Sequence, residues 1–192
     1  MIGLSNEKKS SKDKIIDTAS YLFQTQGYHA TGLNQITQDS GAPKGSLYYY
    51  FPNGKEELAS VAVNRTADIV ARQIEDGLNE YSDPVEAIKQ FIINLANAYE
   101  QGEAKQGLPV ASVALETAHT SEVIRKSCLE AYEKWHGVFS KKLMEAGFTK
   151  EKANELGLVI NAMIEGAFII VVTKKDSEPL RQIASYISHI IK

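Results

Sequence analysis

Cysteine is nearly absent from this chain, because Cys128 is the only one among 192 residues. A single cysteine excludes an intramolecular disulfide and a thiol-rich zinc site, and it is typical of a reduced compartment, so we expect a cytoplasmic protein. The longest apolar run, residues 166–172, is far too short to span a bilayer. The N-terminal residues also lack the apolar run of a signal peptide. We therefore expect no membrane association.

A strong charge of one sign is lacking too. The chain has 21 basic and 24 acidic residues, and its first sixty residues carry six lysines against six acids. Affinity for DNA would therefore depend on individually placed side chains and helix N-termini, not on a general electrostatic attraction. Lys8, Lys9, Lys12 and Lys14 form a basic arm before the first expected helix. A solvated terminus and a DNA-contacting arm remain equally open for it.

Residues 40–58 are the most informative stretch of the chain. Thr31 is expected to cap a short helix, and Gly41 supplies the left-handed residue that ends it. Pro43 then starts a second helix, in whose first turn a missing N–H costs nothing. Two short helices joined by a tight glycine turn are typical of a helix-turn-helix reader of the DNA major groove.

The second of these helices has two distinct faces. At about 100° per residue, Leu47 and Phe51 fall together on one face, while Gly45 and Tyr49 point the opposite way. A glycine lets a duplex approach closely, and tyrosine hydroxyls are good donors to phosphate. Packing of three consecutive tyrosines in a core is the alternative, but residues 48–50 cannot all face one core. We therefore predict that this helix contacts DNA.

The same region closely resembles the N-terminal DNA-binding domain of TetR-family transcriptional repressors. The resemblance rests on Ala19, Leu22, Phe23, Gly27, Tyr28, Thr31, Ile36, residues 41–51 and residues 55–58. It implies that Asn34, Lys44, Gly45 and Ser46 face bases or the groove, and that phosphates are held by Thr31, Tyr48, Tyr49 and Lys55. Gly32, the Ala42-Pro43 turn and residues 51–56 resemble the LmrA/YxaF-like branch, some of whose members respond to flavonoids.

Beyond residue 58 the chain is expected to be helical throughout, which predicts an all-α fold. We expect a three-helix helix-turn-helix domain over residues 1–58 and a helical effector-binding and dimerisation domain over residues 59–192. Capping patterns predict helices that begin near Asn53, Asp83, Ser121, Thr149 and Ser177. No combination of nucleophile, base and orienting group appears, nor a cofactor loop, so we expect neither an enzyme nor a cofactor.

Aromatic residues along the middle helices suggest a chamber for a small-molecule effector. The candidates are Phe91, Tyr99, Trp135, Phe139, Met163 and Phe168, with polar Asn94, Glu116, His119 and Asn161 to orient a ligand. For any single residue, a filled core is the more common reading. Glu116 and His119 could also bind a metal together with Cys128 and His136, but their spacing disfavours that interpretation.

The C-terminal helices indicate a homodimer. Residues 160–170 are apolar nearly all round, and the last helix repeats isoleucines, which predicts an interface at Ile160, Ile164, Ala167, Ile183 and Ile187. Two-fold symmetry then predicts a palindromic double-stranded operator. The leading interpretation is a homodimeric repressor released from its operator by a ligand, through movement of the helix that links the two domains. The alternative is a helix-turn-helix interaction protein that regulates no promoter.

Overall fold

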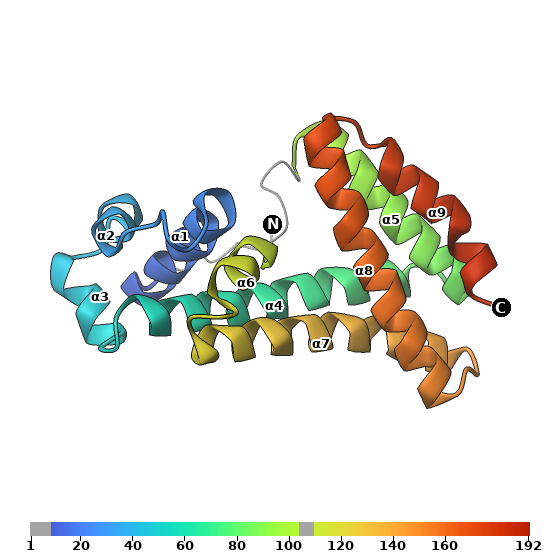
Figure 1. The fold of residues 1–192 in the computed structure, drawn as a ribbon, viewed down its shortest axis with the longest axis horizontal. Coiled ribbons are helices and arrows are strands. Elements are labelled where there is room, and N and C mark those ends of the chain that lie inside the picture. Colours follow the sequence, from blue (N-terminus) through green and yellow to red (C-terminus); the bar gives the residue numbers. More distant parts are fainter. Residues whose placement is uncertain (1–8, 104–109) are drawn as a thin grey trace, which may run out of the picture.

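The structure, a computed structural model, describes residues 9–103 and 110–192, and within those ranges it contains helices and no strands (Figure 1). The all-α prediction is confirmed. The elements in chain order are α1 (Ser11–Gln26), α2 (Leu33–Ser40), α3 (Lys44–Tyr50), α4 (Lys55–Asn79), α5 (Pro84–Gln101), α6 (Ala111–Thr117), α7 (Glu122–Glu145), α8 (Lys150–Lys174) and α9 (Glu178–Ile190).

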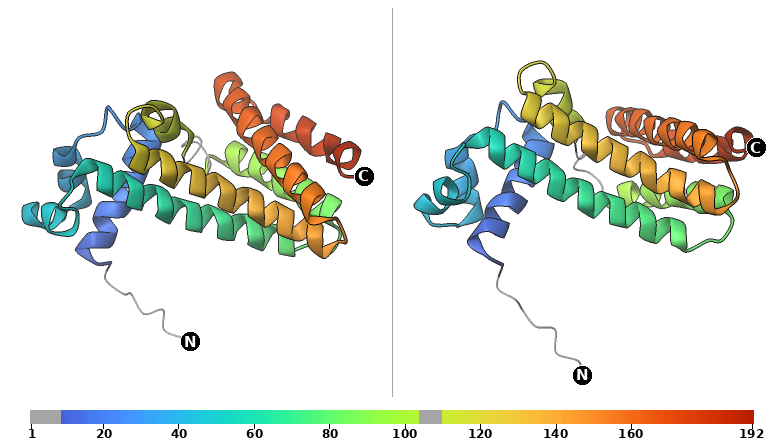
Figure 2. Two further views of the ribbon diagram at one scale, coloured as in Figure 1. Left: turned by 60° about the horizontal axis from the view of Figure 1, so that its bottom comes forward. Right: turned by 90° about the horizontal axis from the view of Figure 1, so that it is seen from below.

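Helices α1, α2 and α3 form a small bundle at one end of the molecule (Figures 1 and 2). Gly41 ends α2 in the left-handed conformation with φ 63°, as predicted. The predicted cap at Thr31 is wrong, because Gly32 occupies the N-cap position of α2. The Thr31 hydroxyl instead donates to the Gly27 carbonyl at 2.8 Å. Glycine is acceptable at an N-cap, so Thr31 is free to close the preceding turn.

This bundle has its own apolar core, built from the faces that the sequence pattern predicts. Its buried residues are Ile15, Ala19, Leu22, Phe23, Ile36, Leu47, Phe51 and Leu58. Leu47 and Phe51 are 0% and 1% exposed, which confirms the inward face of α3. On the opposite face of α3, Tyr48 and Tyr49 are exposed.

Helix α4 joins the bundle to the remainder of the chain without interruption. The predicted domain division at residue 58 therefore falls inside α4 (Lys55–Asn79). Helix α7 runs beside α4 in the same direction. This direction follows from the contacts between the two helices, which join pairs of residues at nearly constant sequence separation. Ser60 meets Ser127 at 2.7 Å near one end, and Glu75 meets Lys141 at 2.8 Å near the other.

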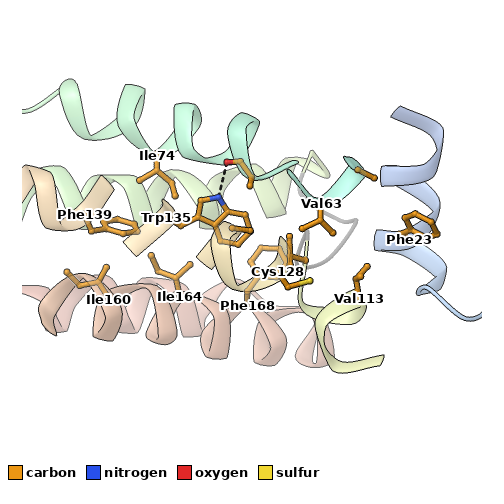
Figure 3. Close-up of a cluster of buried hydrophobic side chains, with 14 of the residues drawn as sticks. Phe23, Val63, Ile74, Val113, Cys128, Trp135, Phe139, Ile160, Ile164 and Phe168 are labelled. Carbon is orange, nitrogen blue, oxygen red and sulfur yellow. Dashed lines mark hydrogen bonds between the residues drawn. The ribbon is translucent and has the colours of Figure 1, made fainter. Parts of the chain in front are cut away.

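Trp135 fixes the middle of this helix pair. Its indole Nε1–H donates to the carbonyl of Ala67 on α4 at 3.1 Å (Figure 3). Figure 3 shows Trp135 and Phe139 of α7 between α4 and the isoleucines of α8. Burial of these aromatic side chains joins α4, α7 and α8 into one core.

Helices α5, α8 and α9 complete the C-terminal part, with α9 packed on α5 and α8 crossing α7 (Figure 1). Gly157 permits the crossing, because a Cβ there would lie 2.4 Å from Ser140 Oγ and 2.7 Å from the His136 carbonyl oxygen. The predicted caps Asp83, Ser121 and Thr149 are confirmed, each accepting a backbone N–H with its side chain. Ser177 occupies the N-cap position of α9 without such a bond.

Candidate DNA-binding surface and ligand chamber

The outer face of α3 presents an unobstructed polar and aromatic surface, which we call the α3 face and define as Lys44, Gly45, Ser46, Tyr48 and Tyr49. Tyr48 and Tyr49 are 60% and 79% exposed. A Cβ added at Gly45 would meet no atom within 4 Å, and its φ is not left-handed. Neither the backbone nor internal packing therefore requires glycine at this position. The open space beside the Gly45 backbone would allow a binding partner to approach the backbone closely.

Two further predicted contact residues lie on the helices before and after α3. Asn34 is exposed on α2, the helix that precedes α3 in the chain. Lys55 begins α4, and its Nζ lies 4.3 Å from the centroid of the Tyr28 ring, close enough for a cation–π contact. Burial lowers the pKa of Lys55. In the basic arm, Lys9 pairs with Asp17 at 2.8 Å, whereas Lys8 lies outside the described residues.

Thr31 does not belong to this surface. Its side chain is 0% exposed, and its hydroxyl is held by the Gly27 carbonyl. The phosphate contact that the resemblance implies for Thr31 is therefore wrong. The threonine instead stabilises the turn between α1 and α2.

A cavity of about 600 Å³ lies between α4, α5, α7 and α8. We call it the chamber. Of the predicted effector residues, it is lined by Phe91, Asn94, Trp135, Phe139, Asn161 and Phe168. Gln24 of α1 also lines it, so the chamber reaches the DNA-binding bundle. Its volume is within the range of small-molecule sites.

Some of the aromatic rings around the chamber contact one another edge to face. Phe91 meets Phe139 edge to face with centroids 5.9 Å apart, and Tyr99 meets Phe168 in the same way at 6.1 Å. Tyr99 is not part of the chamber lining, because it packs behind Phe168. Met163 is not part of the lining either. Helical spacing places both residues near the correct face, but it does not give the depth of each side chain.

Glu116 and His119 are also absent from the chamber, contrary to prediction. The Glu116 carboxylate on α6 accepts the backbone N–H of His29 at 2.7 Å, and the exposed His119 follows the end of α6. Ser112 of α6 donates to the Phe23 carbonyl at 3.2 Å. Helix α6 therefore bridges the DNA-binding bundle to α7, and Glu116 is a residue of that bridge.

The chamber wall also includes polar residues that the sequence prediction missed. They are Gln24, Gln73, Asp76, Glu80, Glu103 and Glu165. Burial raises the pKa of Glu165 to about 7. Asn161 and Glu165 interrupt the most apolar helix of the chain at i, i+4 spacing. That interruption is a signal from which the sequence could have identified Glu165 as well as Asn161.

The alternative metal set does not assemble. Among residues 9–103 and 110–192, no three His, Cys, Asp or Glu side chains come together in a way that could hold a metal ion. Cys128 is buried on α7, and burial raises the pKa of its thiol to about 11. A thiol that stays protonated in an apolar core is an inert packing group.

The residues predicted for the dimer interface are mostly buried within the chain. Ile160, Ile164, Ala167 and Ile187 are between 0% and 9% exposed, and Ile183 is partly buried. They pack α8 and α9 against the rest of the bundle, which leaves little of their surface for a partner chain. The exposed apolar side chains lie on the other side of α8: Leu158, Val159, Ile169, Ile170 and Val172, each between 40% and 54% exposed. With the exposed Ala162 and Gly166 between them, these residues form what we call the α8 outer stripe.

Comparison with known proteins decides the family. Residues 15–62 match the family of bacterial regulatory proteins named tetR, and residues 84–186 match the C-terminal domain of LmrA/YxaF-like transcriptional regulators. This chain belongs to the TetR family. It is 52% identical over 182 residues to the HTH-type transcriptional regulator YxaF of Bacillus subtilis strain 168, covering 95% of each chain. It is 45% identical over 182 residues to the HTH-type transcriptional regulator LmrA of the same strain, covering 95% of this chain and 97% of the other.

Solved structures agree with this TetR-family fold. Escherichia coli NemR in its reduced form superposes with a TM-score of 0.84 at 20% identity, covering 95% of this chain and 97% of the other. A TetR transcriptional regulator from Legionella pneumophila gives 0.82 at 21% identity, covering 97% and 100%. The TetR-family chain is thus a DNA-binding transcriptional regulator with a helix-turn-helix domain and a C-terminal helical domain, and it is not an enzyme.

Proposed function

We propose that this regulator is a cytoplasmic homodimeric repressor, released from a palindromic operator when a small aromatic effector occupies the chamber. The observation that carries this proposal is the position of the chamber. It is lined by the core helices α4 and α7 and also by Gln24 of α1. A ligand in the chamber therefore contacts the DNA-binding bundle as well as the C-terminal helices.

Operator contact is assigned to the α3 face with Asn34 and Lys55. Lys44, Gly45 and Tyr49 lie together at the exposed start and outer side of α3. A side chain at Gly45 would hold the backbone away from base edges, while Lys44 and the tyrosine hydroxyls suit phosphates. With a net charge of −3 on the chain, these placed contacts carry most of the affinity.

Two routes can transmit the state of the chamber to α3. Helix α4 runs directly from the chamber wall to the end of α3, and α6 bridges α7 to α1 through Glu116 and Ser112. A ligand shifts the regulator only if its affinity differs between the DNA-binding and the released conformations. A ligand in the chamber contacts both α4 and α1, so its affinity can depend on how these two helices are arranged.

The α8 outer stripe is assigned to the dimer interface. Helix α8 is long and apolar enough to cross a membrane, but a core helix passes the same test, and part of its most apolar stretch is buried inside the chain. The exposed apolar side chains of the stripe flank the small residues Ala162 and Gly166, which allow two helices to approach closely. Burial against a second copy would cover this area, and a two-fold axis there presents two α3 faces to a palindrome.

A helix-turn-helix interaction protein that regulates no promoter is the alternative. Mapping genomic binding sites and measuring transcripts after deletion of the gene separates the two functions. Binding upstream of genes whose transcripts rise on deletion supports a repressor. Binding without any transcript change contradicts that role.

Lys44→Ala should weaken operator binding by roughly tenfold and lower the salt slope by about one, because one phosphate contact is lost. Titrations of labelled operator at several salt concentrations measure both quantities. Lys150→Ala removes an equal charge from exposed α8 and should change neither. An unchanged affinity and slope in Lys44→Ala would contradict the placement of α3 on the duplex.

A planar aromatic effector should quench Trp135 and release operator over the same concentration range. Trp135 is the only tryptophan, and it lines the chamber, so its emission reports on this site alone. Flavonoids, titrated with correction for absorbed light, are the first compounds to test. Saturable quenching that leaves operator binding intact would mean that the chamber binds ligands without regulating DNA binding.

A further inference from the structure

Two neighbouring polar groups in the chamber wall have no partner among the described residues. The Asn161 side chain is 6% exposed, and neither its amide nor the Glu165 carboxylate makes a hydrogen bond or ion pair there. No fully enclosed side-chain oxygen or nitrogen lacks a partner in that part of the chain. The amide atoms of Asn161 must therefore be open to the chamber. A buried polar group that faces a cavity without a partner is costly unless something binds it.

Asn161 and Glu165 are one helical turn apart on α8. Residues at i, i+4 lie on one face of a helix, so the two groups act on the same region of the chamber. Ile164 and Phe168 share that wall, with Trp135 facing them from α7 (Figure 3). A ligand that lies against these apolar side chains would bring its edge to the Asn161–Glu165 pair.

The charge of the chamber wall is one-sided. Its lining residues include Asp76, Glu80, Glu103 and Glu165, while Lys, Arg and His are absent from its described lining. The Trp135 N–H is already used by Ala67. The described part of the wall is therefore rich in hydrogen-bond acceptors, and it contains no positive charge to offset a negative charge on a ligand. A desolvated anion without a counter-charge binds poorly.

We infer that the Asn161–Glu165 pair is the recognition element of the chamber, and that it selects a planar aromatic molecule that offers a hydrogen-bond donor and carries no negative charge. This inference rests on the proposed effector role of the chamber and specifies its ligand class. Glu165 accepts the hydrogen bond from the ligand hydroxyl, while the Asn161 amide N–H donates to the oxygen of the same hydroxyl. Burial raises the pKa of Glu165 to about 7, and a ligand hydroxyl that donates to the carboxylate would stabilise its charged form.

Three compounds on one scaffold test the selection. Flavone has no donor, 3′-hydroxyflavone adds one phenol, and flavone-3′-carboxylate adds a negative charge at the same position. Quenching of Trp135 at pH 7.5 should show 3′-hydroxyflavone binding roughly tenfold or more tightly than flavone, in line with one hydrogen bond to a charged group, and the carboxylate binding most weakly. Equal affinities, tightest binding of the carboxylate, or no binding by any of the three would overturn the inference.

Variants assign the selection to the pair. Glu165→Gln and Asn161→Ala should each remove most of the affinity advantage of 3′-hydroxyflavone over flavone, and both should leave the affinity for flavone unchanged. Glu165→Gln should also strengthen binding of flavone-3′-carboxylate. Glu155→Gln makes the same change on exposed α8 outside the chamber and should behave as wild type. If Glu165→Gln retains the full ranking, the pair is not the recognition element. Operator release is scored separately, so selective binding without release counts against the proposed function and not against this inference.

Discussion

An Ile169→Asp substitution is expected to leave the chain folded but monomeric, and to weaken operator binding by about a hundredfold or more. Ile169 lies in the α8 outer stripe and is 54% exposed within one chain, so a carboxylate there costs a monomer little. In an isologous interface the substitution occurs twice near the two-fold axis, where two unpaired carboxylates would be buried. Loss of the second α3 face removes the avidity of a palindromic site.

Sedimentation at micromolar concentration and operator titration measure the two effects of Ile169→Asp. Leu115→Asp is the matched control, because Leu115 is 81% exposed on α6 and lies outside the stripe. Ile187→Asp should unfold the chain instead of producing a folded monomer, because Ile187 is 0% exposed and a carboxylate there would be buried in the core. If the Ile169→Asp protein remains dimeric, the proposal that the α8 outer stripe forms the dimer interface is contradicted.

The fold was accessible from the sequence because its signals are local. Asp83, Ser121 and Thr149 each cap a helix with an N–H three residues away, and Gly41 ends α2 through its own φ. Such contacts depend on a few consecutive residues. They remain readable without knowledge of the tertiary structure.

The candidate site was accessible only in part, because its remaining features depend on distant contacts. Helix α8 is apolar nearly all round, so periodicity could not show that Ile164 faces inward while Ile169 faces outward. Glu116 was predicted for the chamber as one of the polar residues that could orient a ligand among the aromatic side chains. Its partner His29 lies 87 residues earlier in the chain, and no local pattern reveals that contact. Depth and long-range pairing are therefore what the sequence did not reveal.

Gly27 lies where α6 meets the DNA-binding bundle. Its backbone has φ 85° and ψ 168°, a region that is essentially restricted to glycine. A Cβ added there would lie 2.0 Å from Glu116 Oε1. The same carboxylate accepts the His29 N–H, so it cannot move away without losing that bond. Two separate effects thus oppose any side chain at Gly27.

Gly27→Ala is accordingly expected to lower the free energy of unfolding by about 3 kcal/mol or more, with about 1–3 kcal/mol from backbone strain and the rest from the clash with Glu116. Glu116→Ala alone should cost about 1 kcal/mol, because it removes one hydrogen bond to a partly solvated N–H. In the double variant the clash is absent while the strain remains, so the cost of Gly27→Ala should shrink by about 1 kcal/mol or more. Urea unfolding of the four proteins gives this coupling energy directly. Strictly additive costs would show that Gly27 is required only for its own backbone conformation, and that Glu116 does not hold α6 against it.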